Sequence, residues 1–232
     1  MIEKKVRRAM KPSGKLQKLI SKRDMSFVDQ IGKDNIGEYD KKTGETPLGV
    51  ACRVGWYQAA FTLIEVGADV NQFCVKKGKT LSITPLYAAL CAYDHKDGDI
   101  VKLLLYSGAN PNLNSDKSPL YADELFRLIV AQGNTDDLAL LIQHGLTVSF
   151  AQMNFAISAD EYEIFKLVHS KLMREGYSLD QIDEQLDFTL ADKAAEEFVR
   201  DYVADLRAKE IAKETRKPVK TKTGMKTRTD II

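Results

Sequence analysis

Residues 44–71 read GETPLGVACRVGWYQAAFTLIEVGADVN, and this stretch decides the fold. Thr46 stands directly before Pro47, which is typical of a helix N-terminus, because threonine can cap the helix and the first turn needs no proline N–H. The first helix ends at Gly55, and apolar residues then recur at three- and four-residue spacing on a second helix. Gly67 is a helix stop of the kind that can take a positive φ. The stretch therefore predicts two short helices and an extended exit.

The same pattern returns twice along the chain. Residues 84–86 (TPL) open a second copy that closes with residues 108–112 (GANPN), and residues 118–120 (SPL) open a third that ends at Gly145. The three openings lie 38 and 34 residues apart. A period of this length is the mark of a stacked repeat architecture. We predict clear copies at 40–72, 82–113 and 116–148, with degenerate units at 15–39 and 149–177.

With its Thr-Pro-Leu openings and its Gly-Ala-Asp-Val-Asn ending, the chain resembles ankyrin-repeat proteins, whose repeats are about 33 residues long. The resemblance implies an all-α solenoid of helix-turn-helix units joined by hairpins. In this family the opening tetrapeptide usually ends in His, whose ring links neighbouring repeats through hydrogen bonds. Here Gly49, Tyr87 and Tyr121 stand at that position. We therefore expect an array that depends more on apolar packing.

The predicted repeat array spans residues 15–177. The segments on either side of it do not have the repeat pattern. Residues 178–213 predict a C-terminal helical cap on the last repeat, and Ser178 and Gln181 form a capping box at its start. The alternative for this segment is a protruding helix that recruits a partner or dimerises. Residues 1–14 form a basic N-terminal segment, and residues 214–232 form a basic tail whose composition predicts disorder.

The net charge of +1 hides an uneven distribution. Residues 1–23 carry +8, from nine Lys/Arg against one Glu, and residues 209–232 carry +5, from eight Lys/Arg against three acids. The segment between them therefore carries −12. Lys/Arg clusters bind phosphate groups, whereas an acidic body repels a duplex. An adaptor that binds nucleic acid or an anionic membrane surface through its basic termini is thus an alternative function.

The composition also indicates a compartment. No run of about 18 apolar residues occurs, so the sequence predicts a soluble protein, and the charged N-terminus is unlike a secretory signal. Cys52, Cys74 and Cys91 are odd in number and not closely spaced, which favours a reducing, cytoplasmic compartment. Short divergent ankyrin proteins also resemble effectors that intracellular bacteria deliver into host cells. A basic tail would suit an export signal in such an effector.

No motif predicts a cofactor or a metal. Residues 78–80 (GKT) imitate the end of a phosphate-binding loop, but Phe73 stands where that motif needs its first glycine. Residues 94–99 (DHKDGD) are acidic but lack the alternating oxygen ligands of a calcium loop. We predict no enzyme activity, and the alternative is an enzyme site in the divergent segment 148–213.

The histidines and cysteines give no nucleophile in a recognisable context. A trio of Cys91, His144 and Asp123 can be assembled on paper, but the local sequence does not support it. His144 precedes the glycine that closes its repeat, where it can lie near helix-end carbonyls. His169 belongs to the second helix of the last pair, and we expect it to be partly exposed.

The resemblance implies a protein partner, bound through hairpin tips and the concave face of the first helices. The hairpin at residues 73–80 is longer than usual in this family. Phe73 either contacts a partner or folds back onto a neighbouring repeat, and the sequence leaves both open. The positions that match the family's binding surfaces, or lie beside them, are Lys41, Lys42, Glu45, Arg53, Phe73, Lys76, Lys77, Lys79, Ile83, Tyr93 and His95. We predict a monomeric, non-catalytic scaffold with no small-molecule substrate.

Overall fold

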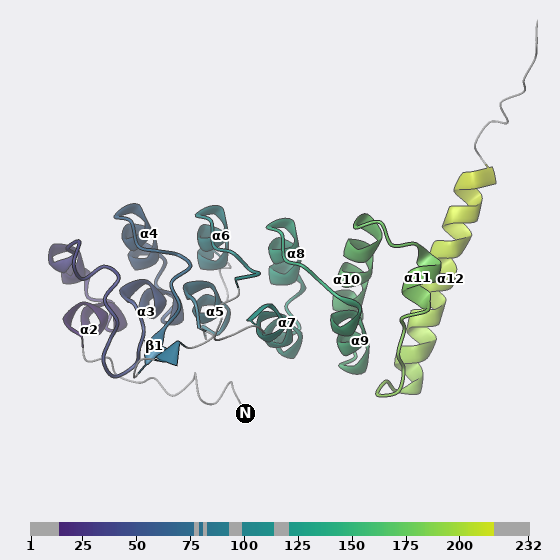
Figure 1. The fold of residues 1–232 in the computed structure, drawn as a ribbon, viewed down its shortest axis with the longest axis horizontal. Coiled ribbons are helices and arrows are strands. Elements are labelled where there is room, and N and C mark those ends of the chain that lie inside the picture. Colours follow the sequence, from purple (N-terminus) through teal and green to yellow (C-terminus); the bar gives the residue numbers. More distant parts are fainter. Residues whose placement is uncertain (1–13, 77–78, 81–82, 93–98, 114–120, 216–232) are drawn as a thin grey trace, which may run out of the picture.

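A computed structural model describes residues 14–76, 79–80, 83–92, 99–113 and 121–215 of the chain. Its helices stack side by side as successive pairs (Figure 1). The first helices of the pairs are α2 (Lys15–Ser21), α3 (Pro47–Arg53), α5 (Pro85–Leu90), α7 (Tyr121–Gln132) and α9 (Phe150–Ser158). Their second helices are the 3₁₀ helix η1 (Met25–Gln30), α4 (Tyr57–Glu65), α6 (Asp99–Tyr106), α8 (Thr135–Gln143) and α10 (Tyr162–Arg174). This arrangement confirms the predicted all-α solenoid.

The remaining elements are a small hairpin and a C-terminal helix pair. The hairpin consists of the two-residue strands β1 (Val75–Lys76) and β2 (Lys79–Thr80). The C-terminal pair consists of α11 (Leu179–Asp183) and the long α12 (Lys193–Thr215). Most of the basic N-terminal segment and of the basic tail, at residues 1–13 and 216–232, lies outside the described residues. Among the described helices, none is both long enough and apolar enough to cross a membrane.

Capping explains where the helices begin and end. The Thr46 hydroxyl accepts the Gly49 N–H at 3.0 Å at the start of α3, and the Thr84 hydroxyl accepts the Tyr87 N–H at 3.2 Å at the start of α5. Each threonine precedes a proline that occupies the first helical position. At the other end of the repeat, Gly67 has a φ of +96°, which lets the chain leave α4 in the left-handed conformation.

One apolar core runs the length of the stack, from Leu16 in α2 to Val203 in α12. Small residues such as Ala51, Ala59 and Ala60 are completely buried between helices, which lets neighbouring helices approach closely. In α3, every residue except Arg53 is buried, and in α5 every residue is buried. These two first helices therefore contribute almost no side chain to the protein surface.

Two asparagines join successive repeats by hydrogen bonds. Asn71 Nδ2 donates to the Gly108 carbonyl at 3.0 Å, and Asn71 Oδ1 accepts the Asn110 N–H at 2.8 Å. Asn112 does the same one repeat later, with Nδ2 donating to the Gly145 carbonyl at 2.6 Å and Oδ1 accepting the Thr147 N–H at 2.9 Å. The array was expected to depend more on apolar packing because the histidines are missing, and these asparagine links add polar contacts between its repeats.

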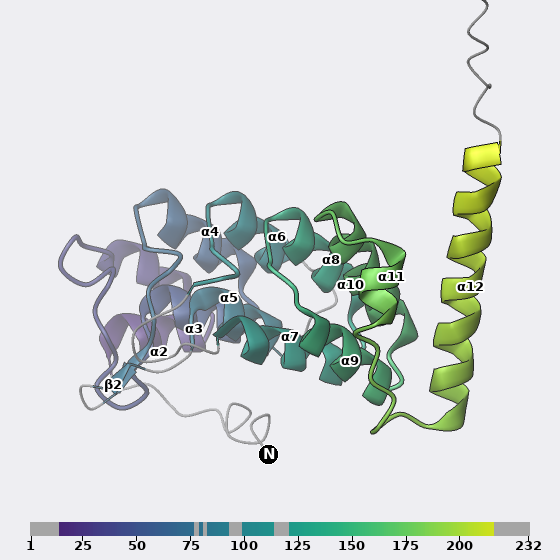
Figure 2. The ribbon, with the colours of Figure 1, turned by 45° about the vertical axis from the view of Figure 1, so that its right-hand side comes forward.

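The C-terminal helix α12 packs against the end of the stack, where it contacts α9 and α11. Its buried residues are Ala195, Val199 and Val203. Farther along, the Arg207 guanidinium bonds Asp180 at 2.9 Å and Asp183 at 2.8 Å, which ties α12 to α11. Beyond Arg207 the described side chains are exposed, and α12 extends past the helix pairs (Figure 2).

Candidate functional site

The first hairpin tip, which we define as residues 40–45, is a turn built around the buried carboxylate of Asp40. This carboxylate accepts three backbone N–H groups, from Gly14 at 2.5 Å, Lys42 at 2.9 Å and Thr43 at 2.7 Å. The turn is closed by a hydrogen bond from the Asp40 N–H to the Glu45 carbonyl at 2.9 Å. Lys41 and Lys42 are exposed at its outer edge. The turn therefore holds two predicted site residues in a defined position on the surface.

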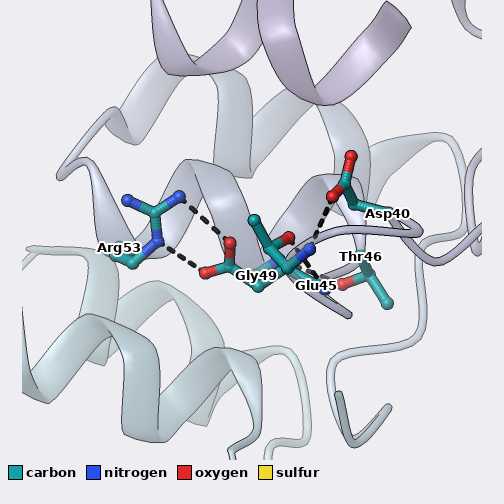
Figure 3. Close-up of polar contacts among 6 residues, drawn as sticks. Asp40, Glu45, Thr46, Gly49 and Arg53 are labelled. Carbon is teal, nitrogen blue, oxygen red and sulfur yellow. Dashed lines mark hydrogen bonds and ion pairs between the residues drawn. The ribbon is translucent and has the colours of Figure 1, made fainter. Parts of the chain in front are cut away.

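Glu45 and Arg53 form an ion pair with each other (Figure 3). Arg53 Nε lies 2.5 Å from Glu45 Oε1, and Arg53 Nη2 lies 3.1 Å from Glu45 Oε2. Only 15% of the arginine side chain and 11% of the glutamate side chain are exposed. Because each charge neutralises the other below the surface, the geometry does not support these two predicted residues as contacts for a partner.

The second hairpin tip, which we define as residues 75–76 and 79–80, lies beside the first. In its antiparallel register Val75 pairs with Thr80 and Lys76 pairs with Lys79. The Val75 N–H donates to the carbonyl of Gly44 in the first tip at 2.9 Å. The two tips are therefore joined by a backbone hydrogen bond, which the sequence did not reveal. The predicted Lys77 lies outside the described residues.

Phe73 and Ile83 flank the second tip and are partly buried. Both pack against the apolar core. Of the two possibilities left open for Phe73, the structure favours the one in which its ring folds back onto the array. The predicted Tyr93 and His95 fall between residues 93 and 98 and lie outside the described residues.

The first-helix face, meaning the side of the stack formed by the first helices, is accessible at α7 and α9. On α7 the exposed residues Asp123, Arg127 and Ala131 follow one another at four-residue spacing. The Arg127 guanidinium carbon lies 4.6 Å from the ring centroid of the half-buried Phe155 on α9. We did not predict this surface from the sequence. The signal that could have indicated it is this stripe of polar and small residues beside the apolar residues 125–126 and 128–130 of α7.

His169 on α10 is only 1% exposed, so the expectation that it is partly exposed was wrong. Its ring centroid lies 5.7 Å from that of Phe165 and 5.3 Å from that of Tyr202 on α12. Neither ring nitrogen has a hydrogen-bond partner among the described residues. Burial disfavours the charged imidazolium and lowers the pKa of His169. The residue therefore packs as a neutral ring between α10 and α12.

The suggested trio of Cys91, His144 and Asp123 has separate contacts in the structure. Cys91 caps the end of α5, Asp123 accepts a hydrogen bond from Gln152 at 2.8 Å, and the His144 ring packs edge-on against Tyr106 at 5.0 Å. Within the described part of the chain, no three His, Cys, Asp or Glu side chains are placed to hold a metal ion.

The two remaining cysteines are buried. Burial raises the pKa of the Cys52 and Cys74 thiols, in the case of Cys74 to about 12. A cysteine attacks as the thiolate, so neither thiol is in a nucleophilic state near neutral pH. The three cysteines, all within the described residues, are not joined by disulfides.

Residues 11–115 match the family model described as ankyrin repeats (3 copies). A protein of Fowlpox virus (strain NVSL), whose name gives it as an ankyrin repeat protein, is 26% identical over 167 residues. The match covers 67% of this chain but only 42% of that viral protein, so the chain spans less than half the length of the curated relative.

Proposed function

We propose that the chain is a non-catalytic scaffold that binds another protein, because residues 11–115 match the ankyrin-repeat model and such repeats generally mediate protein–protein interaction. The contacts are made by the hairpin tips and by the accessible part of the first-helix face. Two observations carry this proposal: Lys41 and Lys42 are exposed on a turn fixed by Asp40, and Arg127 and Phe155 are accessible on α7 and α9.

The chemistry of Arg127 and Phe155 fits a binding surface. Aromatic residues and arginine contribute most of the energy at protein interfaces. The cation–π contact with Phe155 holds the guanidinium over the ring before a partner arrives, so less side-chain entropy is lost on binding. The exposed Asp123 nearby adds a charge of opposite sign, which gives the surface polarity as well as apolar area.

The alternatives have less support. An adaptor for nucleic acid or membranes would depend mainly on the basic residues at 1–13 and 216–232, which lie outside the described residues. The histidine available to an enzyme site at 148–213 is His169. Its ring is buried between Phe165 and Tyr202, so a substrate would not reach it. No observation in the described chain favours either function over a scaffold.

A reducing, cytoplasmic compartment is the environment we propose for this scaffold. The proposal is supported by Cys52, Cys74 and Cys91, which form no disulfide with one another. A monomeric state and an effector role in a host cell remain predictions of the sequence.

Affinity capture from lysate followed by mass spectrometry tests the scaffold function. The full chain is compared with the double variant Arg127→Ala/Phe155→Ala. The matched control is Tyr106→Ala, because Tyr106 is 77% exposed on the second-helix side of the stack. We expect the wild type and Tyr106→Ala to retain the same protein and the double variant to lose it. Retention of the same protein by every variant would contradict the role given to the first-helix face.

A further inference from the structure

We propose that the first hairpin tip, held in place by the second, forms a cationic docking site for an acidic segment of the partner protein. The proposal rests on the scaffold function and names the chemistry of what is bound. Its residues are Lys41 and Lys42, both exposed.

The backbones of the two tips form a single unit. Val75 N–H donates to the carbonyl of Gly44 at 2.9 Å, which joins the second tip to the first. At the base of the second tip, the Cys74 N–H donates to the Ile83 carbonyl at 2.8 Å. The three N–H groups bound by Asp40 hold the first tip in place. The backbone that bears Lys41 and Lys42 is therefore fixed before a partner binds, which lowers the entropy lost on association.

The acidic residues of the first tip do not neutralise these lysines at the surface. The carboxylate of Asp40 is turned inward onto backbone N–H groups, and this residue is only 1% exposed. Glu45 is held by Arg53 through both carboxylate oxygens. The exposed side of the first tip therefore presents the ammonium groups of Lys41 and Lys42 without an exposed carboxylate from the same turn.

The charge at the far end of the stack distinguishes between classes of anion. Residues 134–205, at the opposite end of the stack, contain fifteen acidic residues and five basic ones, a net charge of −10. A long polyanion or a charged membrane surface lying along the stack would be repelled by this end. A short acidic segment contacts only the tips, and the screening length of about 8 Å at physiological salt shields it from the distant charges. The observations therefore favour a protein segment.

The test measures the affinity of the full chain for a synthetic Glu/Asp-rich peptide of about 12 residues, which is long enough to span two neighbouring tips. We expect the double variant Lys41→Glu/Lys42→Glu to bind it at least about tenfold more weakly. The matched control is Lys102→Glu/Lys209→Glu, which makes the same change in net charge at exposed lysines on α6 and α12. The control should keep wild-type affinity, and the wild-type affinity should fall as salt is raised.

Zero-length coupling with a carbodiimide supplies a positional measurement, because it joins an ammonium group only to a carboxylate in contact with it. We expect peptide carboxylates to be coupled to Lys41 and Lys42, as located by mass spectrometry. An equal loss of affinity in both double variants, or coupling spread evenly over exposed lysines, would overturn the proposal.

Two further probes separate the ligand classes. A single-stranded oligonucleotide and phosphatidylserine vesicles are offered in place of the peptide, and tighter binding of either one would also overturn the proposal. A failure of the acidic-segment proposal can be distinguished from a failure of the scaffold function. If the captured partner is retained by Lys41→Glu/Lys42→Glu at high salt, the acidic-segment proposal fails while the scaffold stands. If no protein is captured at all, the scaffold itself fails.

Discussion

The side chain of Asn71 is hydrogen-bonded to the carbonyl of Gly108 in the following repeat, at 3.0 Å, and to the N–H of Asn110, at 2.8 Å. We predict that Asn71→Ala lowers the free energy of unfolding by about 1–2 kcal/mol, because two hydrogen bonds at the surface are lost. Urea unfolding followed by circular dichroism measures the change.

Asn71→Asp is the informative companion variant. It keeps the acceptor for Asn110 but loses the donor to Gly108, so its effect should lie between those of the wild type and Asn71→Ala. If Asn71→Ala were as stable as the wild type, the asparagine links would not contribute to the cohesion of the repeats.

Replacing Asp40 should loosen the first hairpin tip. Asp40→Asn removes the charge and one of the two acceptor oxygens that serve three backbone N–H groups. Since hydrogen bonds to a charged acceptor contribute about 1.5–3 kcal/mol each, we expect a loss of about 2 kcal/mol in stability. Amide hydrogen exchange should accelerate at Lys42 and Thr43. In Asp34→Asn, where the replaced side chain is exposed, exchange at these two amides should be unchanged.

His169 should make stability depend on pH. Its pKa is lowered in the folded chain by burial, whereas in the unfolded chain it lies near the ordinary value of about 6.5. As the pH falls below about 6.5, the unfolded chain takes up a proton that the folded chain does not, so the free energy of unfolding decreases. The decrease approaches about 1.4 kcal/mol per pH unit and stops below the folded-state pKa.

The variant His169→Phe tests this origin. It keeps a ring between Phe165 and Tyr202 but cannot be protonated. Urea midpoints measured from about pH 7.5 to pH 5.5, a window above the ordinary carboxylate range, should fall with pH in the wild type and much less in the variant. If the urea midpoint fell equally steeply with pH in both proteins, groups other than His169 would cause the pH dependence.

The attachment of α12 should depend on apolar contact and not on its ion pairs. Val199→Asp places a carboxylate where the native side chain is completely buried, so we expect α12 to detach from α9 and α11 and become sensitive to limited proteolysis. Arg207→Gln removes bonds to Asp180 and Asp183 that are exposed to solvent, and we expect it to change stability by at most about 1 kcal/mol. If Arg207→Gln released α12 and Val199→Asp did not, the ion pairs and not the apolar contacts would hold this helix.

The helix pairs could be predicted because their signals are local. Thr46, Thr84 and Gly67 act within a few residues of their own position, as caps or stops, and the structure uses each in the predicted way. Which side of α12 is buried depends on its contacts with other helices, and the structure buries Ala195, Val199 and Val203.

The candidate site was harder to predict, since its decisive contacts join distant residues. The ion pair joins Glu45, just before the N-cap of α3, to Arg53, the last residue of that helix, and the bond between Val75 and Gly44 depends on the stacking of two repeats. His169 was misjudged for another reason. It lies four residues after Phe165 and three before Leu172, and this helical spacing already placed it on the apolar side of α10.

The stacking of helix pairs also limits how far any local event can be felt. Contacts pass from α2 to α3, then to α5, α7, α9 and finally α12, so each unit is coupled mainly to its neighbours. Lys41 and Lys42 lie near one end of this sequence of contacts and His169 near the other. Binding at the tips and protonation of His169 should therefore have almost no effect on each other. A single molecule can then respond to a bound partner and to a change in pH as two separate signals.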